Sequence, residues 1–334
     1  MLRALKKKWG PKISSWVPLE FWHTLLGVEL VLPRYHVVSD EDPAHLTGLI
    51  HARSVRQFKA DVEFFLKHYT PVTLKDIIAS LDGTGRLPKR CFLLSFDDGF
   101  RELYDVAAPI LNVQGVPAVF FVSTSLVDNR ELCYLQKKSL LIRALAASGN
   151  SSVGRAASQL LAEAGLEGPE LSSRINRITY RQRHLLDELG PVMECDFAAY
   201  VAAAQPYLSS AQIKELMRQG FDIGAHSVDH PLYSDLTLDE QLRQTRDSLY
   251  WLSEHFHYEC RAFAFPYRDA GVSPEFFQKA FADGRLKVSF GIHGMQRHFF
   301  PRNLERFTME QAHLSAAQAL ARELVVTLFR RPPW

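Results

Sequence analysis

The feature that most constrains the fold is a strand–helix–strand rhythm that occurs twice along the chain. Residues 92–96 form a short apolar run ending in an acidic pair, and a helical pattern at 103–112 and a second apolar run at 116–122 follow. This spacing predicts a parallel βαβ unit. The rhythm returns in apolar runs at 221–225 and 262–265, with a helical pattern between them. The chain is therefore expected to have an α/β fold.

Helix signals support the second half of this pattern. Thr237 with Glu240 three residues later forms a capping box, which marks a helix start. The apolar residues that follow recur at steps of three and four, on one helix face: Leu242, Thr245, Leu249, Leu252 and Phe256. A further helix is expected to start near Pro274, and residues 288–290 are a candidate strand.

The segment before residue 92 resembles the first part of the same fold. Residues 28–32 are strand-like, and the stretch after them carries an amphipathic helix with Phe58, Val62 and Phe65 on its apolar face. Thr73 opens another helix. We therefore expect one α/β barrel rather than a separate N-terminal domain.

Composition divides the chain into segments. Residues 130–208 are rich in Ala, Leu, Ser, Gln and Arg and poor in β-branched runs, which predicts a mostly helical insertion closing over the site. Residues 28–129 and 209–310 then form the barrel. Residues 1–27 are a basic, aromatic N-terminal segment, and residues 311–334 are a C-terminal helix with a basic tail.

Bulk properties exclude several classes of protein. The 334 residues carry a net charge of +2, which does not favour a nucleic-acid partner. Four cysteines without a C-x-x-C pair are too few for a disulfide scaffold, so we expect reduced thiols. No uninterrupted apolar run of about 18 residues occurs, so we expect a cytoplasmic protein without a membrane-spanning helix. The sequence does not indicate an oligomeric state.

The first motif is Ser95-Phe96-Asp97-Asp98-Gly99, in which two adjacent carboxylates follow a buried strand. Neighbouring side chains of an extended chain point apart. One carboxylate can therefore bind a metal while the other faces a substrate. The alternative is a pair of exposed aspartates in a turn before a glycine.

The second motif places His226 and His230 four residues apart, directly after the strand expected at 221–225. We expect the two side chains to lie side by side on a helical turn, a spacing that suits one divalent ion. The pair would lie at the C-terminal end of the barrel, where barrel sites are found. With Asp98 it would form a two-histidine, one-carboxylate site with open positions. The alternative is two independent surface histidines.

The third motif is Phe263-Ala264-Phe265-Pro266-Tyr267, another strand that ends in a turn. Proline fixes the local backbone and can aim the Tyr267 amide into the site, where it could stabilise an oxyanion. Taken alone, the motif also fits a core strand followed by an ordinary turn.

In this order the three motifs resemble the polysaccharide deacetylase family, the family-four carbohydrate esterases with the nodulation-type chitooligosaccharide deacetylase homology domain. The family patterns are T/S-F-D-D-G, H-S/T-x-x-H and R-x-P-Y, and the resemblance covers residues 28–306 apart from the insertion. It implies a distorted (β/α)7-type barrel and a hydrolase that removes an N- or O-acyl group, chiefly acetyl, from a sugar, oligosaccharide or lipid-linked glycan.

The resemblance also implies roles for single residues. Asp97 would be the general base that activates the metal-bound water. Asp98, His226 and His230 would hold one divalent ion, usually zinc, with Co²⁺, Ni²⁺ or Fe²⁺ as alternatives. The amide of Tyr267 would help the metal bind the oxyanion.

The chain departs from the family pattern at two points. The arginine that orients the base falls on Ala264, which leaves Arg268, Arg302 and Arg306 as candidates to pair with Asp97. The chain has no clear copy of the later L-x-x-H motif that supplies the general acid. His293 is expected to replace it, with His298 and His36 as further candidates.

Other functions compete with this interpretation. A metal-dependent amidohydrolase acting on a non-sugar amide would use the same chemistry. A non-catalytic carbohydrate-binding protein on the same scaffold would explain Ala264 and the missing acid motif. An inverting glycosidase is disfavoured because adjacent aspartates cannot easily flank a scissile bond. The expected partner is an acylated glycan. We also expect the basic, aromatic termini to bind peripherally to the inner face of the membrane.

Overall fold

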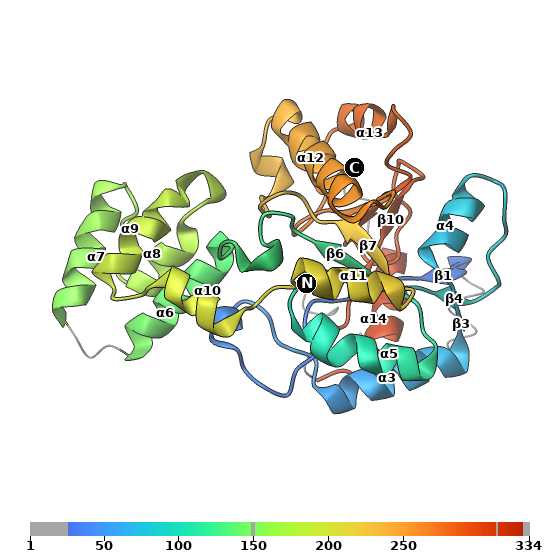
Figure 1. The fold of residues 1–334 in the computed structure, drawn as a ribbon, viewed down its shortest axis with the longest axis horizontal. Helices are drawn as coiled ribbons and strands as arrows, with labels where there is room; N and C mark the ends of the chain where they lie inside the picture. Colours follow the sequence, from blue (N-terminus) through green and yellow to red (C-terminus); the bar gives the residue numbers. More distant parts are fainter. Residues whose placement is uncertain (1–25, 148–150, 312, 330–334) are drawn as a thin grey trace.

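The computed structural model describes residues 26–147, 151–311 and 313–329. Its centre is a sheet of parallel strands (Figure 1). In sheet order the strands are β10 (Asn303–Glu305), β9 (Val288–Gly291), β8 (Ala262–Ala264), β7 (Asp222–Ala225), β6 (Ala118–Val122), β5 (Leu94–Phe96), β2 (Pro33–Tyr35) and β11 (Phe307–Thr308). A small parallel sheet of β1 (Leu30–Val31), β4 (Cys91–Phe92) and β3 (Thr70–Pro71) adjoins it.

The large sheet closes because its two edge strands are parts of one segment. β10 pairs with β9 and β11 pairs with β2, and Arg306 is the residue between β10 and β11. Because β10 and β11 are parts of one continuous segment, the eight strands form a closed barrel with seven strand positions. The predicted distorted (β/α)7-type barrel is confirmed. The segment 303–308 was not predicted as a strand.

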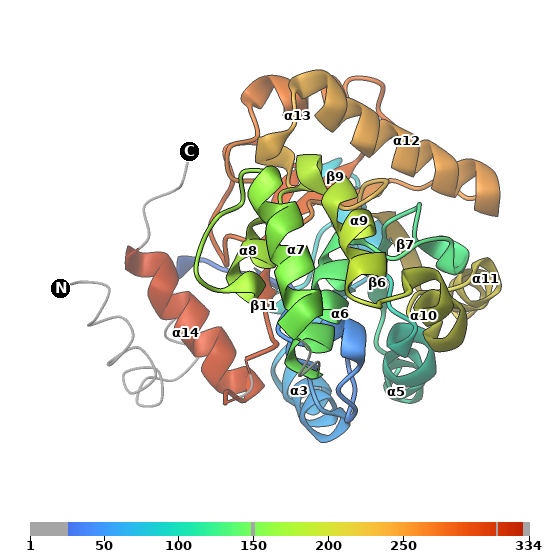
Figure 2. The ribbon, with the colours of Figure 1, turned by 90° about the vertical axis from the view of Figure 1, so that its left-hand side faces the viewer.

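Helices surround the barrel, as Figures 1 and 2 show. They are α3 (Val55–His68), α4 (Leu74–Leu81), α5 (Ala108–Gln114), α11 (Ser210–Arg218), α12 (Leu238–Phe256), α13 (Pro274–Phe281) and α14 (Ala316–Phe329). The capping boxes predicted at Thr73 and Thr237 are both present. Before α5, residues Leu103–Ala107 form a π-helical turn (η2). None of the described helices is long and apolar enough to cross a bilayer.

Two apolar layers follow from the alternation of side chains along the strands. One layer fills the barrel and includes Val119, Phe121 and Phe290. The other packs strands against helices and includes Phe96 and Phe120. Gly224 is required at its position because an added Cβ would lie 2.4 Å from the Phe121 ring, which occupies the barrel interior.

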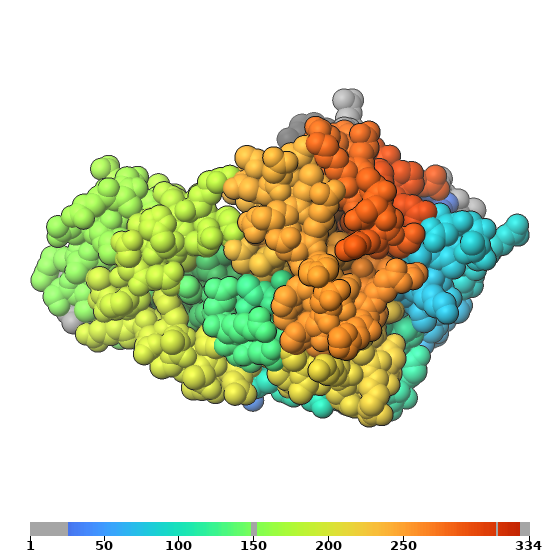
Figure 3. Space-filling view, turned by 45° about the horizontal axis from the view of Figure 1, so that its top comes forward, coloured from blue at the N-terminus to red at the C-terminus, as the bar shows by residue number. Residues whose placement is uncertain are grey.

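Residues 130–208 are mostly helical and form a lobe beside the barrel (Figures 1 and 3). Their helices are α6 (Tyr134–Ala147), α7 (Ser151–Glu163), α8 (Leu171–Arg177), α9 (His184–Val192) and α10 (Phe197–Ala204), with a 3₁₀ turn, η4 (Tyr180–Gln182). The lobe has an apolar core of its own that includes Leu141, Leu161 and Leu186. The predicted N-terminal basic segment and the end of the basic tail lie outside the described residues.

Candidate metal centre and active site

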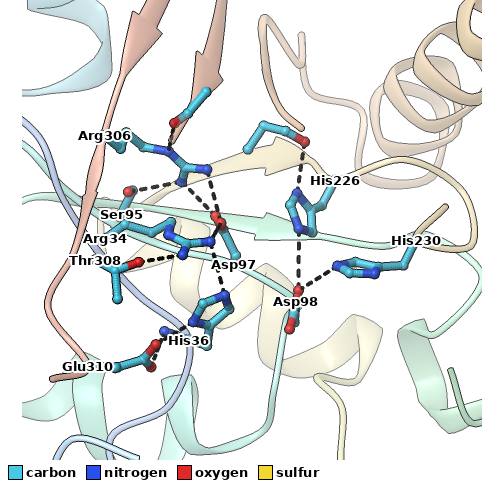
Figure 4. A network of polar contacts seen from close by, with 12 residues as sticks. Arg34, His36, Ser95, Asp97, Asp98, His226, His230, Arg306, Thr308 and Glu310 are labelled. Atoms are coloured by element: carbon cyan, nitrogen blue, oxygen red, sulfur yellow. Dashed lines mark hydrogen bonds and ion pairs between the residues drawn. The ribbon is translucent and has the colours of Figure 1, made fainter. Parts of the chain in front are cut away.

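The polar residues of the site lie where the barrel strands end (Figure 4). Arg34 and His36 belong to the end of β2, Asp97 and Asp98 follow β5, and His226 follows β7. In a parallel sheet these carboxyl ends meet at one edge, where α/β proteins bind their ligands. The folding of the barrel therefore gathers residues that are far apart in the sequence.

Asp97 is fully buried and held by two arginines. Both guanidinium NH2 groups of Arg306 donate to its carboxylate, over 2.6 and 2.9 Å, and Arg34 Nη1 donates to Oδ2 over 3.2 Å. Arg306 Nη1 also donates to Ser95 Oγ. Burial alone raises the pKa of Asp97, but the cations of Arg306 and Arg34 lower it well below its ordinary range. Asp97 is therefore ionised at any working pH.

The structure identifies which candidate arginine pairs with Asp97. Arg306 does so, whereas Arg302 donates to Asp82 over 2.7 Å and Arg268 is exposed. The guanidinium of Arg306 lies over the rings of Phe121 and Phe290, inside the barrel. Arg306 thus reaches Asp97 from the segment that closes the barrel, and an arginine at position 264 is not needed to pair with Asp97.

Asp98, His226 and His230 converge on one point. The Nε2 atoms of His226 and His230 lie 3.3 and 3.0 Å from Asp98 Oδ1, and all three side chains are nearly inaccessible to solvent. The prediction that the histidines sit on a helical turn is wrong. Residues 226–230 form an irregular loop in which Ser227 and His230 have φ values of 69° and 62°.

Hydrogen bonds fix the shape of this loop. The His226 amide donates to Val122 O over 2.9 Å, and Ser123 Oγ donates to His226 O over 3.0 Å. The His230 amide donates to Ser227 Oγ over 3.0 Å. The end of β6 and the bent backbone of the loop therefore bring the two histidines together, the role that the sequence pattern predicts for a helical turn.

The donor set fits a divalent cation. His226 Nδ1 donates to Ala264 O over 2.8 Å, which leaves the Nε2 lone pair facing Asp98, and burial lowers the pKa of His226 so that the ring is neutral. Burial raises the pKa of Asp98, but His230 and His226 lower it well below its ordinary range. Asp98 Oδ1 accepts no hydrogen bond from the described residues. Two imidazoles and one carboxylate with ligand atoms within 4.8 Å suit zinc or a similar ion.

His36 lies on the other side of the acidic pair (Figure 4). Its Nδ1 forms a short hydrogen bond with Glu310, and its Nε2 lies 3.1 Å from Arg34 Nη1. Burial lowers the pKa of His36, but the Glu310 carboxylate more than offsets this, and the pKa is raised above its ordinary value. Glu310 also accepts the amides of His36 and Val37. His36, a further candidate for the acid, therefore belongs to the Asp97 network.

Tyr267 follows β8 with a φ of 58°, a conformation that is uncommon for a residue with a side chain. Its ring lies 5.0 Å from the ring of His230, centroid to centroid. Its amide forms no hydrogen bond within the described residues. The amide therefore remains a candidate donor beside the metal ligands.

His293 lies in a different cluster. Its Nδ1 is 2.9 Å from Asp269 Oδ1 and 3.5 Å from Glu305 Oε2, and these contacts raise its pKa to about 9. Asn303 donates to both carboxylates over 2.7 and 3.3 Å. The geometry gives His293 an ion-pairing role, and the acid role assigned to it stays a prediction without support from these contacts.

A second set of possible metal ligands, Asp269, His298 and Glu305, belongs to the same cluster. His298 Nδ1 accepts the Phe300 amide over 3.0 Å, so the neutral ring carries its proton on Nε2, which faces the carboxylates. This orientation is the reverse of His226. His298 Nε2 therefore carries a proton and lies 3.5 Å from Asp269 Oδ2, so in this tautomer it offers no lone pair to a metal ion.

Residues of the insertion reach the metal ligands. Cys133, Gln136 and Tyr207 of the insertion line a narrow gap together with Leu126, Asp98 and His230. The insertion therefore contributes directly to the surroundings of the site.

Comparison with known proteins agrees with this geometry. A model of the family described as polysaccharide deacetylase matches residues 84–280, more than half of the chain. The poly-beta-1,6-N-acetyl-D-glucosamine N-deacetylase of Staphylococcus epidermidis is 29% identical over 119 residues, which are 32% of this chain and 41% of that protein. The chain thus matches less than half of the length of this relative.

Solved structures share the fold. The deacetylase PplD of Streptococcus pyogenes, in complex with acetate, superposes with a TM-score of 0.57 at 16% identity, over 90% of this chain and 98% of that one. IcaB from Ammonifex degensii gives 0.54 at 18% identity, over 88% and 97%. Members of the matched family are metal-dependent hydrolases. The family match covers the two acidic motif residues, both histidines and Tyr267, and the chain belongs to the polysaccharide deacetylase family.

Proposed function

We propose that this chain is a metal-dependent deacetylase that hydrolyses the N-acetyl group of an amino-sugar glycan. The observation that carries the proposal is the pairing of two different carboxylates at one barrel end. Asp97 is kept ionised by arginines, whereas the adjacent Asp98 faces two histidines. One carboxylate is thus arranged to take a proton and the other to bind a cation.

Asp98, His226 and His230 would hold the cation, with zinc as the expected ion. When bound, such an ion polarises the acyl carbonyl and makes a water molecule more acidic. The remaining coordination positions must come from water and substrate, because three protein ligands leave a site open. This is the arrangement that a hydrolase requires and a purely structural site does not.

Asp97 and His36 would carry out the two proton transfers of the reaction. Asp97 accepts the proton of the attacking water, and Arg306 and Arg34 hold its carboxylate in place for that transfer. The water oxygen adds to the acyl carbon, and the Tyr267 amide is available to stabilise the negative charge on the acyl oxygen. The C–N bond then breaks, and His36, charged through its contact with Glu310, donates a proton to the leaving amine.

His36 is favoured over His293 as the acid because of its neighbours. Arg34 Nη1 lies 3.1 Å from His36 Nε2 and 3.2 Å from Asp97 Oδ2, so the acid and the base are close neighbours. His293 instead contacts Asp269 and Glu305. Protonated His36 has both ring nitrogens as donors, and the one facing Arg34 is then free to serve the amine.

The substrate class rests on the family and on the matched relative. The Staphylococcus epidermidis protein is named for deacetylation of poly-beta-1,6-N-acetyl-D-glucosamine, and we extend its chemistry, an N-acetylated hexosamine polymer, to this chain. A non-sugar amide would use the same side chains. A non-catalytic role is less well supported, because Arg306 now accounts for the substitution at Ala264 and His36 for the missing acid motif.

Metal analysis combined with a substrate panel tests the proposal. The purified protein should contain about one equivalent of divalent metal and release acetate from N-acetylglucosamine oligomers faster than formate or acetate from N-formyl and O-acetyl analogues. A protein that binds one metal but hydrolyses only simple aryl amides would indicate the amidohydrolase. Glycan binding without metal or turnover would indicate the binding protein.

We retain the cytoplasmic location and the peripheral membrane contact as further proposals. The contact would involve the basic and aromatic residues of 1–22 and 328–334, of which all but 328 and 329 lie outside the described part of the chain. Sedimentation with anionic and neutral vesicles would test it, since attraction to anionic head groups must weaken as salt rises.

A further inference from the structure

The two histidines of the metal centre are supported differently. His226 donates its Nδ1 proton to Ala264 O, a contact that fixes both the tautomer and the orientation of the ring. His230 Nδ1 is buried and has no hydrogen-bond partner among the described residues. Some other contact must therefore hold the ring of His230.

The backbone around His230 also requires support. His230 and Tyr267, whose rings lie 5.0 Å apart, have φ values of 62° and 58°. Non-glycine residues in this region carry a conformational cost and persist where their surroundings determine them. Both residues lie in loops after strand ends, and packing against these loops can add to the hydrogen bonds that Ser227 and Ser123 make with the His230 loop.

Two tyrosines of the insertion meet these loops. The hydroxyl of Tyr134, at the start of α6, forms a short hydrogen bond with the hydroxyl of Tyr267. The hydroxyl of Tyr180, in η4, donates to Asp229 Oδ2 over 2.6 Å. The rings of Tyr134 and Tyr180 pack edge to face with centroids 5.8 Å apart. The contacts thus form a closed circuit that runs through Tyr267 and Asp229 to both sides of His230.

Each end of the circuit is fixed in turn. The barrel side is held by Gln244 of α12, which donates to Asp229 Oδ1 over 2.6 Å and accepts the Val228 amide over 2.9 Å. On the side of the insertion, Lys138 Nζ lies 5.2 Å from the Tyr134 ring centroid and donates to Ile178 O over 2.5 Å. Lys138 therefore links the ring of Tyr134 to the backbone that leads into η4.

The docking of η4 adds a second anchor. Arg183 lies over the Tyr180 ring at 4.1 Å, and Arg181 pairs with Glu240 of α12 over 2.9 Å. The Arg181 contact joins the insertion to the same helix that carries Gln244. Movement of the insertion away from α12 would therefore release Asp229 and His230 together.

We propose that Tyr134 and Tyr180 are positioning residues that orient His230 for metal binding, in place of the hydrogen bond that its Nδ1 lacks. The proposal rests on the proposed function in so far as Asp98, His226 and His230 hold a cation. It gives the insertion a role in the surroundings of the metal centre. Neither tyrosine contacts the ion, and each acts through Tyr267 or Asp229.

Metal affinity of the full-length chain tests this proposal. Zinc is titrated into the metal-free protein in competition with a chromophoric chelator, for wild type, Tyr134→Phe and Tyr180→Phe. Loss of a partner that orients a ligand typically weakens metal binding about 10- to 100-fold, and we expect this range for each variant. Release of zinc to excess chelator should be faster in both variants.

Tyr200→Phe is the matched control. Tyr200 also lies in the insertion, and its hydroxyl contacts His45 Nδ1 over 2.9 Å, a contact that involves neither Tyr267 nor Asp229. This variant should bind zinc as wild type does. Equal weakening in Tyr200→Phe would overturn the proposal in favour of a general loosening of the insertion, and wild-type affinity in both test variants would overturn it directly.

The same measurements separate this inference from the proposed function. If the wild-type protein binds no zinc, or if Asp98→Asn binds zinc as wild type does, the assigned metal centre is wrong and both proposals fail. If the wild type binds zinc through Asp98 and only the tyrosine variants are unchanged, the positioning role alone fails. Melting of the metal-free variants, expected to match that of wild type, shows that folding is not the cause.

Discussion

The ion pair between Asp97 and Arg306 holds both side chains in fixed positions. Both side chains are fully buried, and the two hydrogen bonds lie in the bidentate arrangement that guanidinium and carboxylate groups favour. Burying both charges costs desolvation energy, so such a pair is weak evidence for stability in itself. The pair instead holds the Asp97 carboxylate in a fixed orientation beside Asp98, His226 and His230.

Removal of one member of this pair should be costly. Arg306→Gln leaves the Asp97 carboxylate buried with only Arg34, and loss of a buried partner typically destabilises by about 3–5 kcal/mol. Because the pKa of Asp97 is lowered by folding, the contribution of the pair is present above the unfolded value of about 3.9 and lost as pH falls further. Urea unfolding at neutral pH measures the effect. Arg302→Gln, which removes a partly exposed ion pair with Asp82, should change stability little.

Asp97→Asn should retain metal and lose turnover, since an amide cannot accept the proton of water. General-base assistance is typically worth about 10²- to 10⁴-fold. Acetate release and metal content are measured on the same preparation, and circular dichroism checks that the uncompensated arginines are tolerated. Asp98→Asn is the comparison, because it should lose the metal. Wild-type turnover in Asp97→Asn would transfer the base role to another group.

The dependence of the reaction rate on pH should report the protonation of His36. Protonated His36 is the competent form, so activity falls as pH rises through its raised pKa. Glu310→Gln removes the carboxylate that raises this pKa while keeping an oxygen for the two backbone amides, and the alkaline limb should move to lower pH. Glu240→Gln, at an exposed ion pair with Arg181, should leave the limb in place. An unmoved limb in Glu310→Gln would exclude His36 as the acid.

Sequence predicted those site residues that belong to local motifs. Asp97, Asp98, His226, His230 and Tyr267 each follow an apolar run that became a strand, so their place at the barrel end could be inferred from order alone. The remaining partners could not. Glu310 lies 274 residues from His36, and neither residue belongs to a motif that signals the contact.

Arg306 was only one of three arginine candidates, and Arg34 was not a candidate at all. The sequence gives no means of choosing between arginines before the closure of the barrel is known, because Arg306 reaches Asp97 over 209 residues of chain and Arg34 over 63. A buried arginine also leaves no mark in the local pattern of apolar residues.

At the scale of elements, the closing segment shows the limit of hydrophobic pattern. Residues 303–308 carry Asn303, Glu305 and Arg306, whose polar side chains are buried inside ion pairs and hydrogen bonds. A half-buried strand is normally recognised by alternation of apolar and polar residues. Here Arg306 is polar because it pairs with Asp97, and Asn303 and Glu305 are polar because they belong to the cluster around Asp269, so the hydrophobic pattern does not reveal this strand.

Gly224 in β7 offers a test of how tightly the barrel interior is packed. A Cβ at this position would lie 2.4 Å from the Phe121 ring, so Gly224→Ala should destabilise by about 1–3 kcal/mol through overpacking. Gly154→Ala, at a helical glycine with no atom within 4 Å of the added Cβ, should instead stabilise by about 0.5–1 kcal/mol. Opposite signs in urea unfolding are expected. A neutral Gly224→Ala would mean that Phe121 can move aside.

For the whole molecule, the question is whether the insertion and the barrel fold separately. The insertion has its own apolar core, and its two ends lie side by side. Asn129 Nδ2 donates to Tyr207 O over 3.0 Å, and the Tyr207 amide donates to Asn129 Oδ1 over 2.9 Å. A barrel that presents two adjacent chain ends can be joined across them at a small cost in loop entropy.

Replacement of residues 131–205 by a short Gly/Ser linker should therefore leave a folded barrel that binds metal weakly. Asp98, His226 and Ala264 remain in place, so the site keeps two well-supported ligands. His230 loses the circuit through Tyr134 and Tyr180, so affinity should fall at least as far as in the single tyrosine variants. Calorimetric unfolding and zinc titration measure the two effects. A shortened chain that cannot fold would show that the insertion is structural, and one that binds zinc as tightly as the full chain would show that the insertion serves the substrate alone.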